Sequence, residues 1–148
     1  MHKYAHIYFC LQQCAGDSAS RNGNFLETKT NKTMFNEICI YEAKIEKQDE
    51  IEVLMKEVAE FYLAQQGVLD VKYIKRTHRQ KDFNAVKEGE LPVKLTRQIG
   101  KVTYALYLVL ENEEAHANLA KIAMPKFYKR WHRCLTTMPK IILGENIV

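Results

Sequence analysis

The chain has 148 residues, of which 47% are hydrophobic and 27% charged, and it carries a formal net charge of +4. This length fits one domain with a sizeable core, and the composition excludes a chain that is disordered throughout. The positive charge is spread along the sequence rather than gathered in one block, so we expect no nucleic-acid partner. No apolar run approaches the length of a membrane span, so we expect no membrane partner either.

The first part of the sequence differs from the rest. From residue 15 onward it is rich in Gly, Ser, Asn and Thr without sustained periodicity, and the preceding apolar run Ile7–Leu11 is too short for the core of a signal peptide. We predict a flexible N-terminal leader at residues 1–33 and a folded domain at residues 34–148. Met34 is a second candidate for the true start of the protein, in which case the leader is an upstream extension.

The cysteines point to a reduced environment. They show no CxxC pair and no histidine spacing of the zinc type, at Cys10, Cys14, Cys39 and Cys134. Unpaired thiols favour a cytoplasmic protein. The first two lie near His2 and His6, but a four-ligand site on such a short segment lacks support, so we expect no metal.

A strand and a helix are predicted after Phe35. Residues 38–45 alternate as in a strand, with Cys39, Tyr41, Ala43 and Ile45 on one face. Asp49 and Glu52 stand in capping-box spacing, which predicts that a helix begins there. Before the C-terminal stop at Gly67, the apolar positions of this helix keep helical spacing, at Ile51, Leu54, Met55, Val58, Phe61 and Tyr62.

A second strand, residues 68–77, leads into a basic patch and a long arm. In the strand, Leu69, Val71 and Tyr73 alternate against Asp70 and Lys72. The patch surrounds His78 and contains Lys72, Lys75, Arg76, Arg79 and Lys81. It has two interpretations: protection of a hairpin edge against pairing with other chains, which we favour, or guidance of an anionic ligand. The arm, residues 79–99, has a turn at 87–90 and an extended segment at 91–95, and such arms often serve as a lid or a dimer contact.

Residues 102–110 form the central strand. Both faces of this strand are apolar, so both must be covered, and one layer of helices covers only one of them. Asn112 is the expected N-cap of a helix that starts at Glu113, and Pro125 is expected to break that helix or to start a new segment. Phe127 and Trp131 continue an apolar stripe beyond the proline.

A last strand is expected at residues 140–144. The predicted order is therefore β-α-β-β-α-β, an α+β ferredoxin-like plait in which four antiparallel strands carry two helices on one face.

Three short segments resemble one known family. Residues 66–69 (QGVL), 110–115 (LENEEA) and 124–127 (MPKF) are similar, in that order, to local signatures of the antibiotic biosynthesis monooxygenase family of dimeric α/β barrels. The resemblance spans residues 35–144. It implies a homodimer whose sheets meet face to face, with a pocket for a small aromatic ligand between sheet and helices. It also implies a monooxygenase that needs no cofactor.

The resemblance also suggests catalytic residues. His116 stands where quinone-forming members place a catalytic Tyr, and an imidazole there can act as a base towards a phenol. Arg130 would stabilise the resulting phenolate, or it lies in solvent. Asn36 resembles an Asn of the haem-degrading members, which keeps haem binding open. Leu110 where the family often has Trp, and Lys126 where it often has His, argue against haem.

Aromatic residues are the candidates for substrate binding, next to Asn36. They are Tyr41, Tyr73, Tyr107 and Trp131, and each has packing as its alternative role. Two functions are consistent with these residues: a cofactor-independent monooxygenase of a small aromatic compound, or a noncatalytic ligand-binding or stress-response barrel of the same fold. Oxygen consumption with hydroxylated aromatics would separate them.

Overall fold

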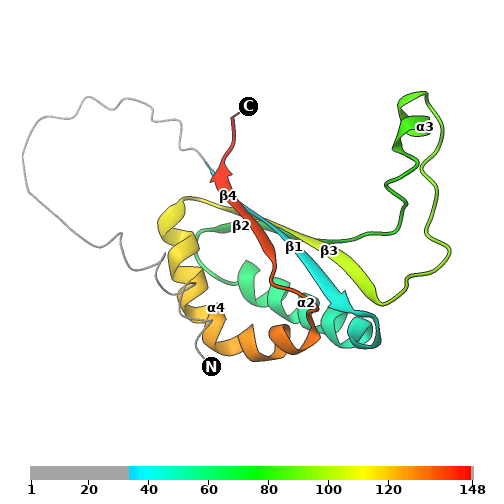
Figure 1. The fold of residues 1–148 in the computed structure, drawn as a ribbon. Coiled ribbons are helices and arrows are strands. Elements are labelled where there is room, and N and C mark those ends of the chain that lie inside the picture. The colour runs from blue at the N-terminus through cyan, green and yellow to red at the C-terminus, as the bar shows by residue number, and fades with distance from the viewer. Residues whose placement is uncertain (1–33, 148) are drawn as a thin grey trace, which may run out of the picture. The chain divides into compact units, whose positions relative to one another are not determined.

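The computed structural model describes residues 34–147, which form an antiparallel sheet with two long helices on one of its faces (Figure 1). Along the chain, the elements are β1 (Phe35–Lys44), a 3-10 turn (Ile45–Lys47), α2 (Gln48–Leu63), β2 (Val68–Lys75), α3 (Phe83–Lys87), β3 (Lys101–Leu110), α4 (Glu113–Cys134) and β4 (Lys140–Glu145). The strands lie in the order β2-β3-β1-β4. The predicted α+β ferredoxin-like plait is confirmed. The leader predicted at 1–33, with Cys10 and Cys14, lies outside the described residues.

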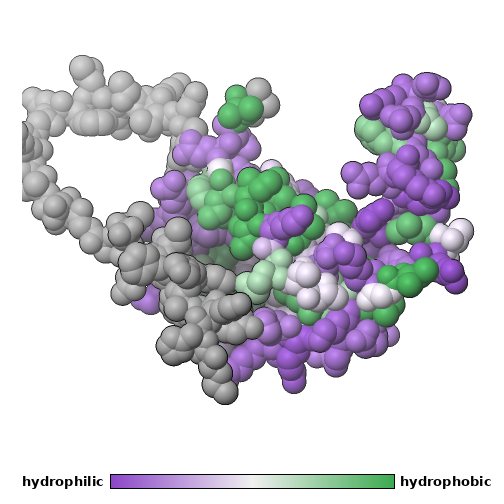
Figure 2. All heavy atoms as spheres, viewed as in Figure 1, coloured by the Kyte–Doolittle hydropathy of each residue, from purple (hydrophilic) through white to green (hydrophobic). Residues whose placement is uncertain are grey.

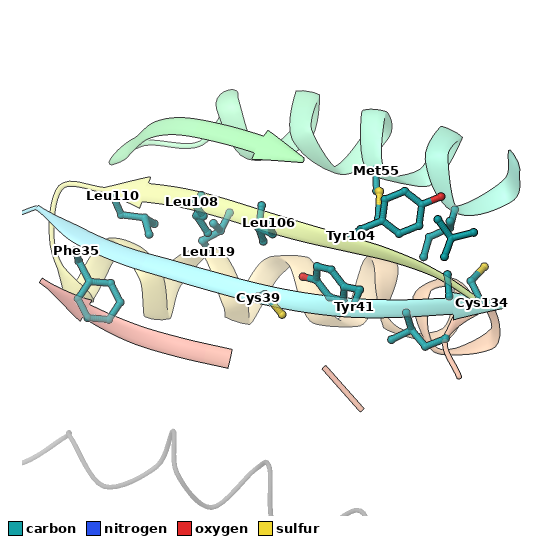
Figure 3. Packing of buried hydrophobic residues seen from close by; sticks show 14 residues of the cluster. Phe35, Cys39, Tyr41, Met55, Tyr104, Leu106, Leu108, Leu110, Leu119 and Cys134 are labelled. Atoms are coloured by element: carbon teal, nitrogen blue, oxygen red, sulfur yellow. The ribbon is translucent and has the colours of Figure 1, made fainter. Parts of the chain in front are cut away.

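The face of the sheet beneath α2 and α4, here called the covered face, carries the core. Alternate residues of β3 point to it and are 0 to 2% exposed: Val102, Tyr104, Leu106, Leu108 and Leu110. Figure 3 shows the last four of them beside Cys39 and Tyr41 of β1, with Met55 of α2 and Leu119 of α4 in the same cluster. The predicted central strand is confirmed, since β3 pairs with both β1 and β2.

The other face of the sheet, here called the open face, carries no helix of residues 34–147. Its isoleucines on β1, β2 and β4 are partly exposed, with Ile38 at 38%, Ile40 at 41%, Ile74 at 58% and Ile142 at 62%. On the covered side, the edge strand β4 is also exposed, since Ile141 and Leu143 are more than half exposed, and apolar side chains gather over β4 at the surface (Figure 2). The domain therefore leaves apolar surface uncovered within residues 34–147.

Helix α2 starts differently from the prediction. It begins at Gln48, straight after the 3-10 turn, and its N-cap Lys47 makes no side-chain capping bond. The expected capping box at Asp49 is therefore wrong, because the 3-10 turn brings the chain into the helix two residues early, with Lys47 as the N-cap. Asp49 lies inside the first turn, where its charge complements the helix dipole. The apolar stripe is as predicted, since the buried residues are Ile51, Leu54, Met55 and Val58.

Helix α4 runs through Pro125 without a break. The expected break is therefore wrong. A proline removes one backbone hydrogen bond and crowds the preceding turn, at a cost of about 3 kcal/mol. Ala123 and Phe127, on either side of it, are both buried in a cluster with Leu54 and Val58 of α2. Packing on both halves keeps the helix in line.

Strand β2 contains a bulge that changes which residues face the core. The register shifts between Val68 and Asp70, so Leu69 is 48% exposed instead of buried as predicted. Val71 and Tyr73 pack against the core cluster. β2 lies at the edge of the sheet, as the favoured interpretation of the basic patch requires.

The arm predicted at residues 79–99 is part of the segment that joins β2 to β3, and from here on the name covers the whole of that segment, residues 76–100. It leaves the sheet at the β2 edge and contains α3 (Figure 1). Its predicted turn follows α3, where Gly89 has a φ of +95° that favours glycine. A bridge between His78 and Lys94 ties the two sides of the arm together. No helix among residues 34–147 is long and apolar enough to cross a membrane.

Candidate active site

A histidine and a glutamate meet on the covered face. Glu37 belongs to β1 and alternates in phase with Cys39 and Tyr41, so its side chain points towards the helices. The Nε2 atom of His116 lies 2.8 Å from Oε2 of Glu37, and the two side chains are only 14% and 15% exposed. A carboxylate that holds one ring nitrogen orients the imidazole and strengthens it as a base at the other nitrogen.

The start of α4 fixes the position of His116. Asn112 caps the helix as predicted, and its side-chain oxygen accepts a hydrogen bond from the backbone N–H of Ala115 at 2.8 Å. The His116 ring then lies against the Phe35 ring, with 5.2 Å between centroids. The start of α4, the Glu37 side chain of β1 and the Phe35 ring thus fix the position of the imidazole.

Gly67 lets this helix start approach the sheet closely. Its φ is +83°, and a Cβ atom added to it would lie 2.6 Å from the Cβ of Ala115. The carbonyl of Gly67 also accepts a hydrogen bond from Glu111 at 2.8 Å. A side chain at position 67 would push the first turn of α4, and with it His116, away from Glu37.

Three tyrosines surround the covered-face carboxylate. Burial raises the pKa values of the Tyr41, Tyr62 and Tyr73 hydroxyls above their ordinary value, and the negative charge of Glu37 adds to the rise. Burial also raises the pKa of the Cys39 thiol to about 11. At neutral pH these groups keep their protons.

Trp131 joins the tyrosines from α4. Its ring makes an edge contact with Tyr41, at 5.0 Å between centroids, and a tilted contact with Tyr73 at 6.0 Å. Both tyrosines and Trp131 belong to, or pack against, the core cluster. The structure therefore brings three of the predicted binding residues together on the same face as His116.

The structure does not bring Asn36 and Tyr107 to that group. Both point to the open face, because they alternate with the covered-face residues of β1 and β3. The Asn36 side chain accepts a hydrogen bond from the Tyr107 hydroxyl at 3.2 Å and donates to the Met34 carbonyl and the Asn146 side chain, each at 3.1 Å. These bonds link the two ends of the domain across the sheet.

Arg130 does not reach His116 either. Its guanidinium pairs with Glu57 of α2 at 2.7 Å, and both side chains are more than 40% exposed. The helical rise of about 1.5 Å per residue puts Arg130 roughly 21 Å along α4 from His116. Of the two roles expected for Arg130, the solvent-exposed one matches its position.

Comparison with known proteins identifies the fold of this chain but no close relative in sequence. No family model matches the sequence, and no curated protein matches it. A solved structure of a candidate antibiotic biosynthesis monooxygenase from Nitrosomonas europaea superposes with a TM-score of 0.56 at 11% identity, over 77% of this chain and 90% of that one. Another candidate of the same name from Bordetella bronchiseptica gives 0.55 at 11% identity, over 78% and 99%. The chain has the antibiotic biosynthesis monooxygenase fold.

Other proteins with this fold have no assigned activity. A conserved protein of unknown function from Bacteroides thetaiotaomicron, described as a possible oxidoreductase, gives a TM-score of 0.57 at 11% identity, over 78% of this chain and 99% of that one. The antibiotic biosynthesis monooxygenase fold is thus shared at identities where site residues are not transferable, and the chemistry must be argued from this chain's own side chains.

Sequence reasoning missed Glu37 and gave Tyr62 only a packing role. The signal for Glu37 was present, because a charged residue in phase with Cys39 and Tyr41 on an apolar strand face needs a partner. That partner is His116, 79 residues away. In residues 34–147, no three His, Cys, Asp or Glu side chains gather as they would to hold a metal ion.

Proposed function

We propose that this protein is a monooxygenase that oxidises a small, electron-rich phenol with molecular oxygen and without a bound cofactor. The observation that carries the proposal is the His116–Glu37 pair on the covered face, 2.8 Å apart and largely withdrawn from water. The name given to solved structures of the same fold supports the reaction class.

The pair supplies the proton acceptor that the reaction needs. Glu37 holds Nε2 of His116, and the imidazole takes the phenolic proton at its other nitrogen. The phenolate is rich enough in electrons to react with oxygen at a ring carbon and form a C–O bond. Loss of water then gives the quinone, so one phenol and one O₂ become one quinone and one H₂O.

The surrounding side chains suit an aromatic substrate. Tyr62 and Tyr73 keep their protons because burial raises their pKa values, so hydroxyl donors are present on the same face, and donors aimed at new negative charge are a main source of catalysis. Phe35 supplies apolar ring surface beside the imidazole. Trp131 follows Arg130 on α4, too far along the helix to reach His116, and packs against Tyr41 and Tyr73. In this assignment Asn36, Tyr107 and Arg130 have no part in the chemistry.

The proposal includes a homodimer that forms through the open face. Ile38, Ile40, Ile74 and Ile142 leave apolar surface there, and a second copy of the same sheet is the partner that the fold offers. A stable interface of this type buries at least about 1,200 Å² in total. We place the protein in the cytoplasm, since Cys39 and Cys134 are both free, buried thiols.

The test is oxygen consumption by the full chain with a panel of naphthols, hydroquinones and anthrones. We expect His116→Gln to lower the rate on the order of 10²-fold, the usual contribution of a general base, and Glu37→Gln to lower it about tenfold. Both variants should keep the wild-type circular dichroism spectrum.

His132→Gln is the matched control, because this exposed histidine lies on the same helix, where its ring makes a tilted contact with Tyr128. Its rate should equal that of the wild type. Binding of the aromatic compounds without oxygen uptake would support the noncatalytic ligand-binding function instead. Full turnover by folded His116→Gln would remove the base from the mechanism.

A further inference from the structure

A small pocket at the base of the arm is rich in positive charge. It has a volume of about 180 Å³, and its lining includes the cations Arg76, Arg97 and Lys101 and no acidic residue. Gln98 and Thr103 add polar groups, and Leu95 and Ile99 add apolar wall. This is smaller than the usual pocket for a drug-sized ligand, so it suits a compact headgroup.

Backbone hydrogen bonds hold the pocket in shape. The N–H of Arg76 donates to the carbonyl of Thr103 at 2.9 Å, and the N–H of Leu95 donates to the carbonyl of Thr77 at 2.9 Å. The side-chain amide of Gln98 donates to the carbonyl of Arg76 at 3.2 Å. The two ends of the arm therefore meet here in a defined arrangement.

The positive charges of the pocket are only partly balanced. Lys101 pairs with Glu42 at 2.7 Å. Within residues 34–147, Arg76 has no carboxylate partner, since its Nε atom donates to the backbone carbonyl of His78, and Arg97 makes no hydrogen bond or ion pair. Two guanidinium groups that line one small space repel each other unless an anion lies between them.

A second polar atom of the pocket also lacks a partner. The Oε1 atom of Gln98 is buried and accepts no hydrogen bond within the described part of the chain. A buried acceptor left in this state is costly, and a bound ligand with a hydrogen-bond donor would satisfy it.

We propose that this pocket binds the headgroup of a small phosphate monoester. A phosphate has oxygen atoms for both guanidinium groups, which bind such oxygens in pairs. Because the second pKa of a phosphate monoester is near 6, part of the phosphate population keeps a P–O–H group. That group can donate a hydrogen bond to Oε1 of Gln98. This site lies on the arm and is separate from the His116–Glu37 pair, and it does not depend on the proposed monooxygenase activity.

Calorimetric titration of the full chain tests the site, with phenyl phosphate, inorganic phosphate and benzoate as probes at constant ionic strength. We expect phenyl phosphate to bind at least tenfold more tightly than benzoate, which has no donor for Gln98. Arg97→Gln should weaken phenyl phosphate at least tenfold. This variant loses no internal partner, so it should melt at or above the wild-type temperature.

Lys81→Gln is the matched control, since this exposed lysine of the same arm does not line the pocket. It should bind phenyl phosphate like the wild type. Equal weakening by both variants would mean that binding reflects only the general positive charge of the arm. Preference for benzoate, or no heat with any probe, would also overturn the proposal. The proposal would also be overturned if no phosphate bound and Arg97→Gln lost self-association. The anionic groups opposite Arg97 would then come from a second copy of the chain.

Discussion

The two faces of the sheet are made by the same strands and are apolar in alternate residues, yet they end in different environments. On β3, Leu106 and Leu108 of the covered face are 2% and 1% exposed. On the neighbouring strand, Ile40 of the open face is 41% exposed. Alternation along a strand shows that a face is suited to burial, but the helices reach only one of the two.

The polar groups of the two faces differ in the same way. Glu37 and His116 on the covered face are paired and largely buried, and the imidazole contacts the Phe35 ring. On the open face, Asn36 and Tyr107 form neutral hydrogen bonds that tie the ends of the chain together. A carboxylate in a core is costly to bury unless it is hydrogen-bonded, which makes the covered face the place to look for chemistry.

The largest effect is expected from a cavity in the covered face. Leu108→Ala should lower the free energy of unfolding by about 2 to 5 kcal/mol, because the side chain is almost fully buried in the core cluster. Ile40→Ala is the matched control on the open face and should cost less than about 1.5 kcal/mol in the monomer. Urea denaturation at two protein concentrations measures both. Equal losses of unfolding free energy for the two variants at low protein concentration would mean that both faces are equally buried in the monomer.

A charge on the open face should break the proposed dimer. We expect Ile142→Asp to raise the dimer dissociation constant at least tenfold, because a carboxylate would have to leave water at the interface. Ile141→Asp is the control. Ile141 is next to Ile142 on β4 and is similarly exposed, but its side chain points away from the open face. Analytical ultracentrifugation measures the association. A wild-type protein that sediments as a monomer at micromolar concentration would contradict the proposal at once.

The smallest effect concerns a carboxylate at the rim of the covered face. Burial alone would raise the pKa of Glu52, but hydrogen bonds from Lys75 and Tyr104 outweigh it and hold that pKa below its ordinary value. A lowered pKa stabilises the fold above the unfolded-state value of 4.5, and the contribution disappears as the pH falls through the folded-state pKa.

Glu52→Gln should therefore lose stability at pH 7 and little at pH 3. The loss at pH 7 should stay below about 1 kcal/mol, because the side chain is 36% exposed and solvent screens its ion pair. Thermal melts at both pH values measure it, with Glu57→Gln on the same helix as control. A larger loss at pH 3 than at pH 7 would reverse the sign of the argument.

Periodicity predicted most of the fold. The helical stripe from Ile51 to Val58, the Asn112 cap and the alternation of β3 depend on neighbours within a few residues, and each is found as predicted. The misses come from tertiary effects. Packing of Ala123 and Phe127 against α2 overrides Pro125, and the bulge after Val68 turns Leu69 outward.

The candidate site was predicted in part. His116, Tyr41, Tyr73 and Trp131 share the covered face, but the sequence could not show that Asn36 and Tyr107 belong to the opposite one until strand phase was combined with the position of the helices. Glu37 was missed because its partner is 79 residues away, and no local pattern joins them.

The arm has a consequence for how this domain can vary. Closing a flexible loop between two paired strands costs entropy that grows only with the logarithm of loop length, about 0.6 kcal/mol for each doubling. The pairing of β2 with β3 is therefore almost as stable across residues 76–100 as it would be across a connection of half that length. Insertions and deletions near α3 should be nearly neutral for folding, so the part of the arm around α3 is free to diverge in length while the sheet stays the same.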